Sequence, residues 1–253
     1  MDDDSRLDRE RSVSARGRAA LVFGGSRGIG AAAVKRLASD GYAVAFTYVS
    51  SGDKAQQLVA EVHREGGTAL AIPADSGDAD AILAAVSTAV GRFGPLSVVL
   101  VNAGLLRTGS ITSVSRDDLD AMINVNIRGV FLAIQAAVPH LVDHARVITV
   151  GSNVAIRSGS GASVYQFTKA AVAAMVKGVA LDLAPRGITV NNIQPGPTET
   201  DMTAGAIEAL SGASPLRRVG SPGEIAGLVS YLARDESRYI TGTSITIDGG
   251  YTL

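Results

Sequence analysis

The chain has 253 residues, enough for one large α/β domain with a sizeable core. Its 23 Lys and Arg nearly balance its 24 Asp and Glu, so a net charge of −1 gives no support to nucleic-acid binding or to attraction by an anionic membrane. Because it has no cysteine, disulfides and thiolate metal sites are excluded.

Short apolar runs alternate with longer helical patterns along most of the chain. The expected strands are Ala19–Phe23, Ala43–Tyr48, Ala69–Ile72, Ser97–Val101, Arg146–Val150, Ile188–Ile193 and Ser244–Ile247. The expected helices are Gly28–Ser39, Asp53–Glu65, Asp78–Gly91, Arg116–Val138, Ala162–Leu183 and one that begins near Ser221. This alternation predicts one Rossmann-type α/β domain over residues 18–253, a doubly wound parallel sheet with helices on both faces and ligands at the carboxyl ends of the strands.

The first 17 residues are dense in Asp and Arg and contain no apolar stretch. We expect a disordered arm there, with a role in subunit contacts as the alternative, and no signal peptide. No segment reaches the ~20 apolar residues that a membrane span needs. A cytoplasmic protein is therefore expected.

A glycine-rich turn, Gly24-Gly25-Ser26-Arg27-Gly28-Ile29-Gly30, joins the first strand to the first helix. Glycine permits a tight turn and lets backbone N–H groups approach a pyrophosphate at the positive end of a helix. Such spacing is often a plain turn, but a strand before it and a helix after it favour a dinucleotide site.

The stretch after the second strand decides which dinucleotide is expected. It reads Phe46-Thr47-Tyr48-Val49-Ser50-Ser51-Gly52 and lacks the acid that bonds the ribose 2′-hydroxyl in NAD sites. A carboxylate there would repel a 2′-phosphate, so its absence permits NADP(H). Arg27 offers a cation, unless it is only a solvated surface charge, and Ser50 or Ser51 can donate to phosphate. Asp53, the nearest acid, favours the N-terminus of the next helix.

Tyr165 and Lys169 lie one helical turn apart, so their side chains converge on one face. An ammonium near a phenol favours the phenolate and should lower the pKa of Tyr165. Ser152 adds a hydroxyl that can hold a carbonyl oxygen. Beside a dinucleotide site, this set predicts hydride transfer without a metal. His140 and His144, both expected on helices, lack a third ligand and make a weak metal case.

Five segments together resemble the short-chain dehydrogenase/reductase family over residues 18–253, most closely its 3-oxoacyl-acyl-carrier-protein reductases. They are the glycine turn, Asn102-Ala103-Gly104, Asn126, Ser152 with Tyr165 and Lys169, and Pro195-Gly196. The resemblance implies a sheet order of 3-2-1-4-5-6-7 and a homotetramer or homodimer built on the two long helices. It also implies a substrate lid over residues 198–219, for which an ordinary connecting helix and loop is the alternative.

The resemblance assigns a role to each catalytic candidate. Tyr165 would be the general acid, Lys169 would tune it and bond the nicotinamide ribose, and Ser152 would bond the carbonyl oxygen. Asn126 would anchor a water of the proton relay. Asn124 is its rival, although only Asn126 matches the family register.

Cofactor contacts are implied for twenty residues. These are Gly24, Ser26, Arg27, Gly28, Ile29, Gly30, Tyr48, Ser50, Ser51, Asp75, Ser76, Asn102, Ala103, Gly104, Tyr165, Lys169, Pro195, Gly196, Thr198 and Thr200. Asp75 would contact adenine, and capping of the loop before the next helix is a compatible role. Phe23 and Val101 stand where the family usually has Thr and Asn, so both parts of a bracing contact depart from its pattern.

The sequence thus predicts an NADP(H)-dependent enzyme that reduces a small carbonyl compound, such as a 3-oxoacyl thioester, to an alcohol. One alternative is a nucleotide-binding regulator that has lost turnover, and another is a dehydrogenase that oxidises alcohols, sugars or steroids. Basic residues that could face an acyl carrier protein are Arg107, Arg128, Arg157, Arg217 and Arg218.

Overall fold

Seven parallel strands form one sheet in the computed structural model, which describes residues 18–253. The order β3-β2-β1-β4-β5-β6-β7 confirms the expected topology. The strands are β1 Ala19–Phe23, β2 Ala43–Tyr48, β3 Thr68–Pro73, β4 Leu96–Val101, β5 Leu141–Val150, β6 Thr189–Pro195 and β7 Ser244–Ile247. The predicted disorder of residues 1–17 lies outside the described residues.

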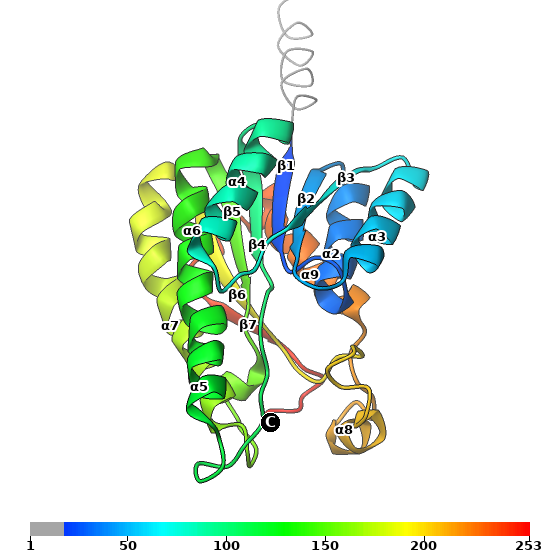
Figure 1. Ribbon diagram of the computed structural model, residues 1–253, viewed down its shortest axis with the longest axis vertical. Helices are drawn as coiled ribbons and strands as arrows, with labels where there is room; N and C mark the ends of the chain where they lie inside the picture. Colours follow the sequence, from blue (N-terminus) through cyan, green and yellow to red (C-terminus); the bar gives the residue numbers. More distant parts are fainter. Residues whose placement is uncertain (1–17) are drawn as a thin grey trace, which may run out of the picture.

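Helices cover both faces of the sheet (Figure 1). They are α2 Gly28–Ser39, α3 Gly52–Arg64, α4 Ala79–Phe93, α5 Arg116–Ile123, α6 Val130–Ala137, α7 Ser163–Leu183, α8 Ile207–Ala213 and α9 Pro222–Ala233. One core cluster joins a sheet face to α4, α6 and α7, and a second joins the other face to α2, α3 and α9. Leu21 and Val22 point into opposite clusters, because successive strand residues face opposite sides. Burial on both faces explains why the strands read as continuous apolar runs.

The helix predicted over Arg116–Val138 forms one continuous rod, but its type changes along its length from α to π and back to α. Asn124–Gly129 forms a π-helical segment between α5 and α6, and a short 3₁₀ turn over Val138–His140 follows. A Cβ atom at Gly129 would overlap the carbonyl oxygen of Ser76, so the rod approaches the loop after β3 very closely there. Such π segments often mark functional sites, and this one contains Asn126.

The same rod is apolar enough to span a membrane by length and composition alone. Its 18-residue window has a mean hydropathy of 1.5, although no segment of this kind was expected from the sequence. The rod is a core helix, since Met122, Val130 and Ile134 are buried against the rest of the domain. However, only 39% of the window is buried, which leaves part of an apolar surface on this flank.

β5 begins five residues before its predicted start. Pro139 ends the helical rod, and Leu141 already pairs with Leu96 across an irregular register. His144 lies in this strand with a φ of 63°, so the expectation that it sits on a helix was wrong. Within residues 18–253, no three His, Cys, Asp or Glu side chains are grouped so as to hold a metal ion.

Residues 198–219 leave the sheet after β6 and return at α9. Their one helix, α8, lies beyond the carboxyl ends of the strands, below α2 and α9 in Figure 1. The start of α9 near Ser221 is confirmed, because the Ser221 hydroxyl and the Glu224 carboxylate form a reciprocal capping box. The two ends of the segment meet where Thr198 pairs with Gly220 as an isolated bridge.

Candidate active site

The turn between β1 and α2 tolerates only glycine at several positions. Gly24 has a φ of 77°, and a Cβ atom on it would lie 2.8 Å from Ala103 Cα. A Cβ atom on Gly30 would overlap the carbonyl oxygen of Gly24. Arg27 is the N-cap residue of α2, yet its side chain makes no capping hydrogen bond. The first N–H groups of α2 therefore lie beside a tight turn built largely of glycine, which fits a dinucleotide pyrophosphate.

Phe23 and Val101, the two departures from the family pattern, lie side by side in the sheet. The two residues are register partners on β1 and β4, and both are buried in the same core cluster. The turns are braced by other groups instead. Asn102 Nδ2 donates to the Gly24 carbonyl at 2.7 Å, and the Gly24 N–H donates to Thr47 Oγ1 at 2.9 Å.

Two cations that lie at the starts of α2 and α3 share one carboxylate. Arg27 Nη1 lies 3.3 Å, and Lys54 Nζ 3.4 Å, from Oδ2 of Asp201. Asp53 lies in the first turn of α3, as expected. Lys54 and Asp201 were not among the residues predicted from the sequence. A signal for Lys54 existed, since a lysine in the first turn after β2 lies close to the expected 2′-phosphate.

The loop after β3 holds the proposed adenine contacts Asp75 and Ser76. Asp75 Oδ1 accepts the Gly77 N–H at 2.8 Å, so it stabilises a turn, while Asp78 provides the N-cap of α4. Asn124, the rival of Asn126, donates from Nδ2 to the Gly77 carbonyl at 2.9 Å. Asn124 therefore supports this loop.

The four catalytic candidates come from three elements that meet at the carboxyl edge of the sheet. Ser152 lies two residues past the end of β5, and Tyr165 and Lys169 lie in the first two turns of α7. Lys169 Nζ lies 5.6 Å from the centre of the Tyr165 ring. A Cβ atom at Gly104 would lie 3.2 Å from Lys169 Nζ and 3.6 Å from Asn126 Oδ1, so these residues surround one small volume.

Burial dominates the ionisation of Tyr165 and Lys169. It raises the pKa of Tyr165 to about 12, and a hydrogen bond with Ser152 opposes the rise. Burial also lowers the pKa of Lys169 to about 8. The expectation that Lys169 lowers the pKa of Tyr165 is therefore wrong for this arrangement. The ammonium donates to the Val150 carbonyl at 3.0 Å and lies over the ring of Tyr165, and burial of the phenol outweighs its attraction for the phenolate.

Asn126 is fully buried, and its amide holds the loop after β4. Its Oδ1 accepts the Leu105 N–H at 2.7 Å, while Nδ2 donates to the Leu105 carbonyl at 2.8 Å and to Thr168 Oγ1 at 3.1 Å. Thr168 immediately precedes Lys169. Asn126 thus ties the π segment to the Gly104 loop and to the catalytic face of α7.

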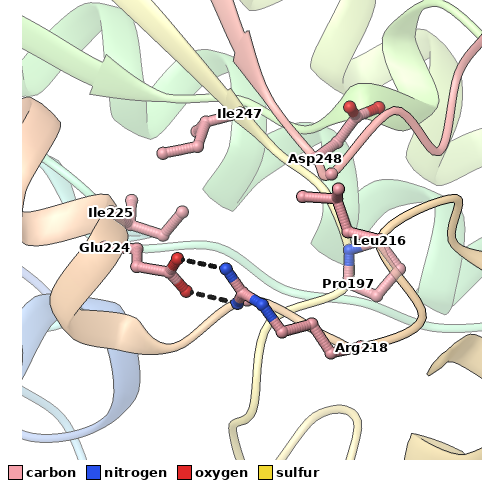
Figure 2. Close-up of a pocket in the computed structure, with 9 residues that line it drawn as sticks. Pro197, Leu216, Arg218, Glu224, Ile225, Ile247 and Asp248 are labelled. Carbon is pink, nitrogen blue, oxygen red and sulfur yellow. Dashed lines mark hydrogen bonds and ion pairs between the residues drawn. The ribbon is translucent and has the colours of Figure 1, made fainter.

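A cavity of about 120 Å³ lies between the ends of β6 and β7 and the C-terminal part of residues 198–219 (Figure 2). Arg218 forms its wall and binds both carboxylate oxygens of Glu224, at 2.8 and 2.6 Å. This pairing, with the Ser221 N–H, lowers the pKa of Glu224 to about 2. None of the four catalytic candidates lines the cavity, so we assign no substrate to it.

The five arginines considered for a carrier protein are all exposed. Each of them forms a hydrogen bond or an ion pair with a neighbouring group. Their partners, in chain order, are Asp118 for Arg107, Asn124 for Arg128, the Tyr251 and Leu253 carbonyls for Arg157, the Gly212 carbonyl for Arg217 and Glu224 for Arg218. These contacts fix where the charges lie.

The chain is similar to known proteins over nearly its whole length. Residues 24–252 match the family model described as enoyl-(acyl carrier protein) reductase. A short-chain dehydrogenase/reductase from Serratia marcescens is 48% identical with a TM-score of 0.91, over 94% of this chain and 99% of that one. A short-chain dehydrogenase from Burkholderia cenocepacia, solved in complex with NADP, is 44% identical with the same TM-score and coverage. A 3-oxoacyl-(acyl-carrier-protein) reductase of Staphylococcus aureus is 38% identical over 239 residues, 92% of this chain and 97% of the relative.

Proposed function

The chain belongs to the short-chain dehydrogenase/reductase family, and we propose that it is an NADP(H)-dependent oxidoreductase that reduces a ketone to a secondary alcohol. The observation that carries the proposal is the convergence of Ser152, Tyr165 and Lys169 beside the glycine turn. When bound, the nicotinamide supplies a hydride. The chain's own residues then have to orient the carbonyl and deliver a proton to its oxygen.

Each catalytic candidate has one task in this proposal. The Ser152 hydroxyl donates to the ketone oxygen and orients it, and the Tyr165 phenol gives its proton to the same oxygen as negative charge develops there. A phenol with a pKa of about 12 is protonated at neutral pH, which suits an acid. Lys169 holds the nicotinamide ribose, and Asn126 positions the loop and helix around this volume.

The preference for NADP(H) rests on charge. No acidic residue follows β2 before Asp53, while Arg27 and Lys54 place two cations near the strand end. The phosphate of NADP(H) would add charge-assisted hydrogen bonds to these groups, and a carboxylate at that strand end would have repelled it. The Burkholderia relative that was solved with NADP supports the same choice.

Replacing Arg27 by Ala should weaken NADPH binding by about 1–3 kcal/mol and leave NADH binding nearly unchanged, because only NADPH has the 2′-phosphate. Titration of cofactor fluorescence would give both dissociation constants. Arg64→Ala removes an exposed arginine at the far end of α3 and is the matched control. Equal losses for both cofactors would contradict the assigned contact.

A 3-oxoacyl thioester is the proposed substrate class, on the strength of the Staphylococcus aureus relative. NADPH consumption should be measured across ketones, small 3-oxoacyl thioesters and 3-oxoacyl groups on a carrier protein. Turnover of the thioesters supports the proposal, and a carrier-protein advantage would add that partner. Tight NADPH binding without turnover of any carbonyl would instead support a regulator, and activity only with alcohols and NADP would support an oxidative dehydrogenase.

Residues 198–219 are proposed as the lid over this substrate. The segment starts beside the proposed nicotinamide contacts Pro195 and Gly196, and its ends are joined by the Thr198–Gly220 bridge. α8 has no fully buried residue, and the segment also contacts the rest of the domain near its two ends, through Asp201 and through Leu216. A segment built in this way can move as a unit without disturbing the sheet.

We also propose a cytoplasmic homotetramer or homodimer that buries the flank formed by α6 and α7. Phe131 is 46%, Phe167 42% and Leu181 77% exposed on these helices, which is costly for a monomer. Sedimentation at micromolar concentration should give a dimer or tetramer, and Phe167→Glu should shift it to smaller species. Leu83→Glu, at an exposed position of α4, should leave the mass unchanged. A wild-type monomer would refute the assembly.

A further inference from the structure

Asp201 links the proposed lid to the cofactor side of the domain. It lies near the start of residues 198–219, and its Oδ2 atom is shared by Arg27 at 3.3 Å and Lys54 at 3.4 Å. These two cations are far from Asp201 in sequence and belong to different helices. The carboxylate thus bridges three separate segments of the chain.

The position of this carboxylate matches the position expected for an anion of the cofactor. Arg27 precedes the first turn of α2 and Lys54 lies in the first turn of α3, so both cations stand beside the positive ends of helices. Ser50 and Ser51, the proposed phosphate donors, lie between β2 and α3. One oxygen held by two cations is also how a phosphate oxygen would be bound there.

We propose that the Asp201 carboxylate competes with the 2′-phosphate of NADP(H) for Arg27 and Lys54. Asp201 is then a specificity residue that couples the identity of the bound cofactor to the position of residues 198–203, the lid root. NADP(H) releases Asp201, whereas NAD(H), which lacks the phosphate, leaves it paired. This inference rests on the proposed NADP(H) dependence.

Electrostatic repulsion favours replacement of the Asp201 carboxylate by the 2′-phosphate over binding of both anions at once. Lys54 first, and then Arg27, hold the pKa of Asp201 below its ordinary value, so the group is ionised at neutral pH. A 2′-phosphate carries close to two negative charges there, and the two anions would repel each other at contact distance. The side chains of Arg27, Lys54 and Asp201 are each more than half exposed, so the ion pairs are readily exchanged.

Release of Asp201 would change the position of its neighbours in the lid root. Thr203 Oγ1 accepts the Thr200 N–H at 3.1 Å and donates to the Thr198 carbonyl at 2.5 Å, which makes residues 198–203 a compact turn. Thr200 also packs against the glycine turn, since a Cβ atom at Gly28 would lie 3.1 Å from its Cγ2. A shift of Asp201 therefore moves a turn that touches both the cofactor cradle and the start of the lid.

The first test measures cofactor affinity of the full-length protein. Asp201→Asn should bind NADPH about three- to tenfold more tightly at low salt, the range expected for removing a competitor held by two exposed ion pairs, and NADH within twofold of wild type. Glu208→Gln, which removes an exposed lid carboxylate without an ion pair among residues 18–253, should change neither. Weaker NADPH binding by Asp201→Asn would mean that Asp201 only orients the cations and would overturn the competition.

The second test follows the lid root by hydrogen exchange of residues 198–206. In the wild type, amides near Asp201 should exchange faster with saturating NADPH than with saturating NADH, and Asp201→Asn should abolish this difference. Identical exchange in the two wild-type complexes would overturn the coupling. A wild type that prefers NADH would instead refute the proposed cofactor, so the two failures are distinguishable.

Discussion

Tyr165→Phe is expected to lower ketone turnover by at least ~10²-fold, as befits loss of a positioned acid. The phenol is the proton donor assigned to the ketone oxygen, and Phe keeps the ring and its packing against Lys169. Cofactor affinity and the free energy of unfolding should therefore stay near wild type. Steady-state rates with NADPH and a good ketone, together with denaturant unfolding, would measure both.

Tyr231→Phe is the matched control for this change. Tyr231 is a partly exposed tyrosine on α9, away from the candidate site, and its hydroxyl has no assigned role. Loss of this hydroxyl should leave turnover unchanged. Near-normal reductase activity of Tyr165→Phe on the same substrate would show that another group donates the proton.

Local patterns were sufficient to predict the sheet. Buried parallel strands read as short apolar runs, and the family order of strands follows from the resemblance, so all seven strands and their order were correct. The errors lie where tertiary contacts act on the backbone. Neither the π segment over Asn124–Gly129 nor the early start of β5 has a periodic signal in the sequence. Both coincide with contacts between distant residues, of Gly129 with Ser76 and of Leu141 with Leu96.

In the candidate site, too, local patterns predicted some features correctly, and other features were missed or predicted wrongly. Motif spacing predicted that Ser152, Tyr165 and Lys169 would meet, since β5 ends and α7 begins at the same edge of the sheet. Asp201 was missed because its significance depends on a contact with Lys54 across 147 residues, whereas the position of Lys54 in the first turn after β2 was visible in the sequence and was overlooked. The pKa of Tyr165 was predicted in the wrong direction, because spacing brings an ammonium near a phenol but does not report how deeply both are buried.

Burial of Lys169 should make this residue costly for the stability of the fold. Its side chain is 3% exposed, and burial lowers its pKa from 10.5 to about 8. At pH 7 the native state holds an ammonium in an apolar setting, while the unfolded chain solvates it freely. Below about pH 8 the lysine is protonated in both states, so the full cost applies. Between about 8 and 10.5 only the unfolded state keeps the proton, and the cost fades as the pH rises.

Lys169→Met should therefore raise the free energy of unfolding at pH 7 by about 2 kcal/mol, after allowance for the lost hydrogen bond to the Val150 carbonyl. The gain should shrink steadily as the pH rises from 8 toward 10.5. Lys177→Met, at an exposed position of α7, should show neither the gain nor its pH dependence.

The same Lys169 variant should lose reductase activity and bind NADPH more weakly, because the ammonium serves the ribose. Denaturant unfolding from pH 7 to about 10.5 would measure the free energy of unfolding of the Lys169 variant against wild type. A Lys169→Met protein that is less stable than wild type at pH 7 would show that the lysine stabilises the fold, whereas the expected gain would show that stability is given up here for catalysis.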